Sequence, residues 1–176
     1  MKNIITRKFR IISALLLCLC ITTSTLRADT IVPIEGTWKP QEFTLTDLDQ
    51  QLHRLADYQG KVLLINFWAS WCTPCITEMP GIQRLSDALK DQPFEILTIN
   101  VSDVENRIRE FLKRMNLNLT VLLDSDGKVF NAWHGKVLPA SYLVDGNGMI
   151  RYHVIGPMEW DNDKVHKIIV SLIKQH

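Results

Sequence analysis

Two cysteines separated by two residues, Cys72 and Cys75, are the residues of this chain best suited to covalent chemistry. An apolar run over residues 62–68 precedes them, and residues after 74 show helical spacing to about residue 89. A strand that delivers a C-x-x-C pair to the start of a helix is the arrangement of a thiol–disulfide redox site. The pattern therefore predicts a redox-active disulfide that works without a bound cofactor or metal.

A purely structural disulfide is the alternative for the same pair. The other two cysteines of the chain, Cys18 and Cys20, lie in the N-terminal segment, so no second pair remains to brace the domain. Small exported proteins that depend on disulfides have more of them. A bridge across so short a loop constrains the unfolded chain little, because that effect grows with loop length. The redox interpretation is therefore favoured.

The positions of the two cysteines predict different roles. Cys72 falls just before or at the first helical residue, where unpaired N–H groups and the helix dipole favour a thiolate. We expect its pKa to lie below that of a free cysteine, which makes Cys72 the attacking thiol. Cys75 lies one turn further on, and we expect it to be more buried and to resolve the mixed disulfide. Pro74 is compatible with a first helical turn, where its missing N–H is not needed.

Glu78 is the candidate acid–base residue. Together with Ile82, Leu85 and Leu89 it follows the apolar stripe of the expected helix, at positions i, i+4, i+7 and i+11. Burial there should raise the pKa of the carboxyl, which could then pass a proton to or from Cys75, three residues earlier. The alternative is a surface glutamate at the edge of the stripe.

The elements that position these residues can be expected from hydrophobic periodicity. Strands are predicted at 42–47, 62–67, 95–101 and 120–123, a hairpin at 141–155, and helices at 74–89, 104–115, 128–133 and 165–172. This order predicts an α/β fold with a mixed central sheet flanked by helices and an N-terminal strand or hairpin extension.

The N-terminal segment has the composition of a targeting signal. Four basic residues precede an uncharged stretch at 11–23, which fits a secretory signal and is short for a membrane span. We expect residues 1–28 to be a signal peptide or an uncleaved membrane anchor. Residues 29–40 are expected to form an extended lead-in or linker, followed by one folded domain at 41–176.

Charge and histidine spacing argue against a nucleic-acid-binding surface and against a metal site built from histidines. Residues 29–176 carry 15 Lys and Arg against 19 Asp and Glu, without the basic stripe of a nucleic-acid surface. The histidines lack metal-ligand spacing. Of these, His134 alone is expected near the cysteine pair, on a loop without a special role.

Three motifs resemble one family. They are Asn66-Phe67-Trp68-Ala69-Ser70-Trp71-Cys72-Thr73-Pro74-Cys75, Glu78-Met79-Pro80, and Leu138-Pro139-Ala140-Ser141-Tyr142-Leu143-Val144-Asp145. With the terminal hairpin and helix they resemble the exported TlpA/ResA-like thiol–disulfide oxidoreductases of the thioredoxin-like superfamily, over roughly residues 40–175. Two positions depart from related patterns: Ala140 replaces a more common Thr, and Asn66 replaces the buried Asp of cytosolic thioredoxins.

The resemblance implies a site, a location and partners. It implies a thioredoxin-like fold over 41–176, with a cis Leu138–Pro139 bond that faces the cysteines and pairs with an extended substrate; a trans turn proline is the alternative. Trp71 is expected to shield one side of the site, unless it is a plain core aromatic. The implied function is that of a periplasmic or extracytoplasmic reductant for disulfides in exported proteins, such as apocytochrome c or copper-assembly proteins. The implied electron donor is a membrane thiol carrier of the DsbD/CcdA type.

Two alternatives stay open at the level of sequence. A disulfide oxidase of the DsbA type is disfavoured because such enzymes usually carry a helical insertion for which the chain has little room. A copper-binding or scaffolding module is the alternative from another class, since two thiolates would suit Cu(I).

Overall fold

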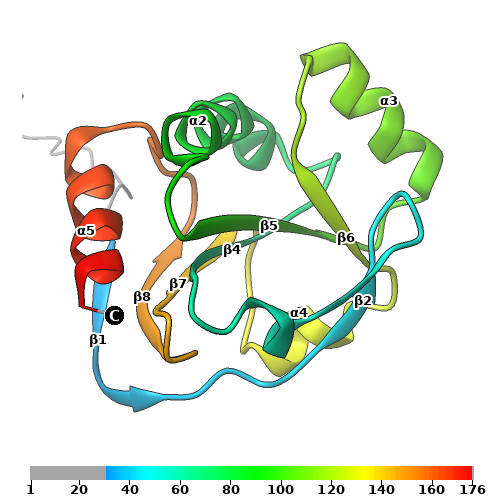
Figure 1. The fold of residues 1–176 in the computed structure, drawn as a ribbon. Coiled ribbons are helices and arrows are strands. Elements are labelled where there is room, and N and C mark those ends of the chain that lie inside the picture. The colour runs from blue at the N-terminus through cyan, green and yellow to red at the C-terminus, as the bar shows by residue number, and fades with distance from the viewer. Residues whose placement is uncertain (1–30, 176) are drawn as a thin grey trace, which may run out of the picture.

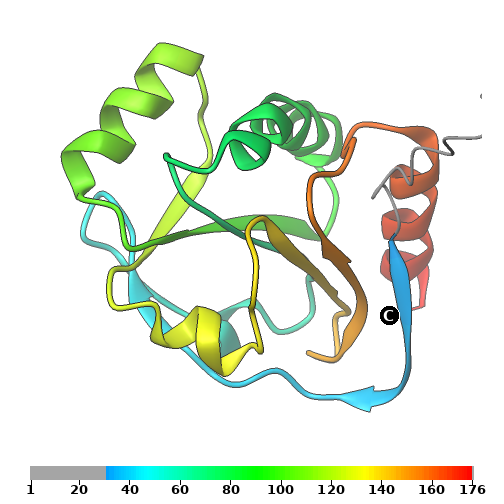
Figure 2. The same cartoon turned by 180° about the vertical axis from the view of Figure 1, so that it is seen from behind.

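The computed structural model describes residues 31–175, so the signal or anchor expected at 1–28 lies outside the described residues. The elements, in chain order, are β1 (Val32–Trp38), β2 (Thr44–Thr46), β3 (Leu52–Arg54), the 3₁₀ helix η1 (Leu55–Tyr58), β4 (Val62–Trp68), α2 (Thr73–Leu89), β5 (Phe94–Val101), α3 (Glu105–Met115), β6 (Thr120–Asp124), α4 (Lys128–Ala132), β7 (Ala140–Val144), β8 (Ile150–Ile155) and α5 (Asp163–Lys174). Figures 1 and 2 show helices on both faces of one twisted sheet. The α/β prediction, with a mixed sheet between helices, is confirmed.

The main sheet has six strands in the order β1-β8-β7-β4-β5-β6. Strands β4, β5 and β6 are parallel, while β7, β8 and β1 each run antiparallel to their neighbour. β4 therefore lies inside the sheet, with β5 on one side and β7 on the other. Because β4 is fully buried, its sequence is apolar except for Asn66.

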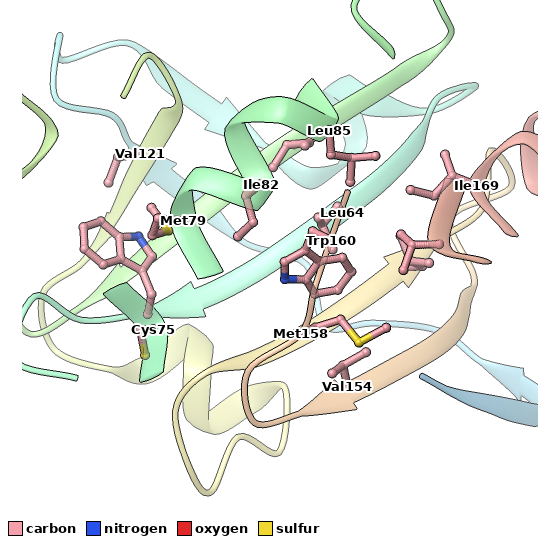
Figure 3. Close-up of a cluster of buried hydrophobic side chains, with 14 of the residues drawn as sticks. Leu64, Cys75, Met79, Ile82, Leu85, Val121, Val154, Met158, Trp160 and Ile169 are labelled. Atoms are coloured by element: carbon pink, nitrogen blue, oxygen red, sulfur yellow. The ribbon is translucent and has the colours of Figure 1, made fainter. Parts of the chain in front are cut away.

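The alternation of β4 divides the core into two layers. Leu64 and Trp68 face α2 and α5, whereas Leu63, Ile65 and Phe67 face the layer that contains Phe43 and Trp133. Figure 3 shows the first layer, in which side chains of α2 meet Leu64 of β4 and Trp160. Asn66 has the parity of the first layer, so its polar side chain is directed towards α2.

The segment expected as a lead-in differs from a free linker. Val32–Trp38 forms the edge strand β1, which pairs antiparallel with β8. Pro33 stands opposite Tyr152, and the register shifts between Pro33 and Trp38. An edge strand tolerates a proline and an irregular register, because one side of its backbone is unpaired. These residues are therefore extended, as expected, but they belong to the sheet.

The remaining expected elements are found with small changes in their bounds. β2 and β3 form a two-stranded extension, and β7 and β8 form the terminal hairpin around residues 145–148. The expected short helix at 128–133 is α4. Within residues 31–175, no helix combines the length and apolar character needed to cross a bilayer.

Candidate active site

The two cysteines form a disulfide at the start of α2. Cys72 is the N-cap residue of the helix, as predicted, and Cys75 lies in its first turn. Sγ of Cys72 accepts a hydrogen bond from the backbone N–H of Cys75 at 3.3 Å. Cys75 is fully buried, while Cys72 retains 6% of its surface and Pro74, between them, is exposed. The geometry therefore leaves Cys72 as the more accessible sulfur, next to unpaired helix N–H groups that stabilise a thiolate.

Glu78 is buried one turn after Cys75, on the same stripe as Ile82, Leu85 and Leu89. It is 4% exposed, which excludes the alternative of a surface glutamate. Its carboxylate accepts hydrogen bonds from Nδ2 of Asn66 at 2.8 Å, the backbone N–H of Met158 at 3.0 Å and Nε1 of Trp160 at 3.1 Å.

Burial controls the titration of Glu78. Desolvation raises the pKa of its carboxyl to about 7, and the three hydrogen bonds, which favour the charged form, oppose that rise without cancelling it. A carboxyl with a pKa near neutrality can both take up and release a proton under ordinary conditions. The predicted burial and raised pKa are confirmed.

The segment between β8 and α5 supplies two of these donors because it lies close against α2. At Gly81 of α2, a Cβ would lie 3.1 Å from Oδ1 of Asp161 and 3.6 Å from the backbone N of Trp160. Nε of Arg84, also on α2, donates to Oδ2 of Asp161 at 2.7 Å. A small residue and an ion pair thus hold residues 157–161 against the helix. A hollow lined by Thr77, Glu78 and residues 157–159 connects this region with the surface.

Asn66 contacts Glu78, although the sequence identifies it only as a departure from the pattern of cytosolic thioredoxins. It is fully buried in β4, and its Nδ2 also donates to Oγ of Ser141 in β7 at 2.9 Å. The two residues are partners in the β4–β7 register. Asn66 therefore connects Glu78 on the helix with the strand that follows Pro139.

Asp103 fixes the turn before Cys72, and sequence reasoning missed it. Its buried carboxylate accepts hydrogen bonds from the backbone N–H of Ser70 at 2.6 Å and from Oγ of Ser70 at 2.9 Å. Nδ2 of Asn100, at the end of β5, donates to the same carboxylate at 2.9 Å. The turn that carries Trp71 and Cys72 is thereby tied to the neighbouring strand.

Trp71 is 63% exposed, so it is not a core aromatic. It lines a shallow hollow with Ser70 and with residues of α3, among them Arg107 and Phe111. On the chain beyond α4, the Leu138–Pro139 bond is cis, and Pro139 is buried while Leu138 is partly exposed. The alternative of a trans proline is therefore excluded.

Two of the histidines of the described chain, His53 and His134, have side-chain contacts. His134 packs its ring against Trp38, and His53 bonds to Asp47 and Tyr58 in the β2–β3 extension. Within residues 31–175, no group of three or more His, Cys, Asp or Glu side chains is arranged to hold a metal ion.

Known thiol–disulfide oxidoreductases are similar to this chain in sequence. A model of the AhpC/TSA family matches residues 39–153, which is more than half of the chain. The thiol–disulfide oxidoreductase ResA of Geobacillus kaustophilus is 37% identical over 125 residues, covering 71% of this chain and 72% of the relative. This chain belongs to the AhpC/TSA family, as a ResA-like thiol–disulfide oxidoreductase. ResA of Bacillus subtilis is similar at 33% identity over 124 residues, with 70% of this chain and 69% of the relative covered.

Two solved structures have the same fold as this ResA-like chain. StoA of Bacillus subtilis superposes with a TM-score of 0.60 at 28% identity, over 68% of this chain and 90% of StoA. A Chlorobium tepidum protein assigned as the thiol:disulfide interchange protein DsbE gives a TM-score of 0.72 at 25% identity, over 80% of this chain and 99% of that protein. The thioredoxin-like fold and thiol–disulfide oxidoreductase activity predicted from the sequence are confirmed.

Proposed function

We propose that this ResA-like protein reduces disulfides in exported proteins, with Cys72 as the attacking thiol and Cys75 as the resolving thiol. The Cys72 thiolate attacks one sulfur of the substrate disulfide, a mixed disulfide forms, and the first substrate sulfur leaves as a thiolate that takes up a proton. Cys75 loses its proton to Glu78 and attacks Cys72, which expels the second substrate sulfur. Two electrons pass to the substrate, and the protein ends as the Cys72–Cys75 disulfide.

The burial of Glu78 one helical turn after Cys75 is the observation that carries this proposal. A resolving thiol reacts as a thiolate, and Cys75 is shut off from water, which would otherwise accept its proton. Glu78 is the carboxyl on the same helix face, and its pKa of about 7 suits it to accept that proton.

The surroundings suggest how a substrate would be held. The exposed Trp71 precedes Cys72 in the chain, and Leu138 with the cis Pro139 comes immediately before β7. We propose that both contact the substrate, because Pro139 lacks an N–H and an extended segment can pair with the backbone around Leu138.

The N-terminal composition supports action outside the cytoplasm, as a periplasmic protein or one anchored to the inner membrane by residues 1–28. For such a protein we propose a membrane thiol carrier of the DsbD/CcdA type as electron donor. Apocytochrome c and copper-assembly proteins are the proposed substrates.

Insulin reduction tests the activity. With dithiothreitol as electron donor, the wild-type protein should accelerate insulin precipitation, and Cys72→Ser should not. A rate for Cys72→Ser equal to that of the wild type would refute the assigned nucleophile. Copper titration of the reduced protein tests the copper-binding alternative, which predicts stoichiometric Cu(I) binding together with no acceleration of insulin reduction.

Trapping identifies the partners. Cys75→Ala should accumulate mixed disulfides through Cys72 in the exporting cell, because the resolving thiol is missing. The matched control is the double variant Cys72→Ala/Cys75→Ala, which should trap nothing. Recovery of the same adducts with both variants would show that the capture does not pass through Cys72.

A further inference from the structure

The two carboxylate oxygens of Glu78 have different surroundings. Oε2 accepts from the backbone N–H of Met158 and from Nε1 of Trp160, and both groups can act only as donors. Within the described chain, the hydrogen bonds to Oε1 come from Nδ2 of Asn66. A proton on Oε2 would face two donors that cannot turn into acceptors. The proton of neutral Glu78 therefore belongs on Oε1.

One end of the Asn66 amide is hydrogen-bonded within the described chain, and the other end is not. Nδ2 donates to Oε1 of Glu78 at 2.8 Å and to Oγ of Ser141 at 2.9 Å, which engages both of its hydrogens. Oδ1 is buried and has no hydrogen-bond partner among the described residues. A buried acceptor without a partner is uncommon in proteins and calls for a physical reason.

A half turn of the amide about its terminal torsion exchanges the two ends with little change in shape. We propose that the Asn66 amide turns over whenever Glu78 gains or loses its proton, which makes Asn66 the positioning residue for the proton on Oε1. In the neutral state, Oδ1 accepts the Oε1–H of Glu78 and the hydroxyl hydrogen of Ser141. In the ionised state, Nδ2 donates to both residues, as the structure shows.

The two arrangements have the same number of Asn66 hydrogen bonds. Each leaves one end of the amide without a partner, Oδ1 when Glu78 is ionised and Nδ2 when it is neutral. An Asn66 amide that rotates can therefore hydrogen-bond Glu78 in both protonation states, whereas Trp160 and Met158 favour the ionised state alone. The pKa of about 7 at Glu78 reflects burial against all three hydrogen bonds of the ionised arrangement, that from Asn66 included, and the proposed rotation would remove the part contributed by Asn66.

The catalytic role of the Asn66 amide rotation rests on the proposed function, in which Glu78 exchanges a proton with Cys75. The rotation itself does not rest on that function, since it needs only a change in pH. Glu159, which lines the hollow next to Glu78, is the other ionisable side chain of that hollow. The cysteines do not titrate as a disulfide, so the oxidised protein isolates the event from thiol chemistry.

Nuclear magnetic resonance of the oxidised wild-type protein tests the proposal. The side-chain amide hydrogens of Asn66 should show nuclear Overhauser contacts to the β-hydrogens of Ser141 at high pH. These contacts should be lost at the same midpoint at which the carboxyl carbon of Glu78 titrates. Contacts that persist unchanged through the titration of Glu78 would overturn the proposal, whether or not the protein reduces insulin.

Two variants provide a quantitative contrast. Trp160→Phe removes a donor that serves only the ionised state, so the proton affinity of Glu78 should rise about tenfold or more. Asn66→Leu removes a donor from one state and an acceptor from the other, so the proton affinity should change less than about threefold. If Asn66→Leu raised the proton affinity of Glu78 as much as Trp160→Phe does, Asn66 would be a fixed donor and the amide rotation would be refuted.

Discussion

Glu78 places an ionisable group where water is largely excluded, and the free energy of that burial depends on pH. Its pKa rises from 4.5 to about 7 on folding, so the folded state binds the proton more tightly than the unfolded state. The contribution of Glu78 to stability is therefore greatest below pH 4.5 and is lost as the pH rises to about 7.

The expected size of this effect is about 3 kcal/mol. We predict that the free energy of unfolding of Glu78→Gln, relative to the oxidised wild type, increases by about that amount between about pH 4 and pH 8. Urea unfolding at the two pH values measures it, and comparing the two proteins cancels the other titrating groups. A difference that does not vary with pH would show that Glu78 has an ordinary pKa in the folded state.

The same carboxyl should control the resolving step. In the reaction of the reduced protein with a chromogenic aromatic disulfide, the second phase reports attack by Cys75 on the mixed disulfide. We predict that its rate rises through about pH 7 in the wild type, as Glu78 ionises, and is at least tenfold lower in Glu78→Gln at neutral pH. Glu95→Gln, which alters an exposed carboxyl paired with Lys61, is the matched control and should behave as the wild type.

At the scale of elements, the turn before α2 depends on Asp103 beyond the end of β5. Asp103→Ala leaves the N–H of Ser70 and the amide of Asn100 without their acceptor, and should lower the free energy of unfolding by about 2 kcal/mol. It should also slow insulin reduction, because the turn that presents Cys72 is loosened. Asp103→Asn retains an acceptor oxygen and the side-chain shape, so its losses of stability and of insulin-reduction rate should both be smaller than those of Asp103→Ala. Equal losses in the two variants would show that the effect comes from the charge of Asp103 alone.

The elements and residues that could be predicted from the sequence are those whose signals are local. The spacing of Cys72, Cys75 and Glu78 along one helix fixes which face each occupies, and helical periodicity suffices to read it. Asn66, Asp103 and Trp160 act through contacts with distant parts of the chain. Glu78 and Trp160, for example, are 82 residues apart, and no local pattern reports that pairing.

The β1 strand shows a second limit of sequence reasoning. Pro33 and Gly36 are typical of a linker, and they disfavour a central strand. The edge of a sheet accepts them, but whether an edge is available depends on where β8 ends up in the fold. The sequence therefore predicts an extended segment without predicting its partner.

At the scale of the whole molecule, β1 should contribute to stability as part of the domain. Ile31 is buried in the core, and Trp38 packs edge-on against Tyr142 at 5.9 Å between ring centroids. We predict that a chain starting at residue 41 is less stable by roughly 2–4 kcal/mol than one starting at residue 29. Urea unfolding of the two truncated proteins tests this prediction. Equal midpoints would show that residues 29–40 act as a linker and do not stabilise the domain.

The direction of electron flow is the central claim for the whole molecule, and the reduction potential of the Cys72–Cys75 couple tests it most directly. Equilibration with dithiothreitol at about pH 7 should give a value below about −200 mV, in the range of proteins that donate electrons. A value near about −120 mV, as in strong disulfide oxidants, would contradict the account and make the protein an oxidase.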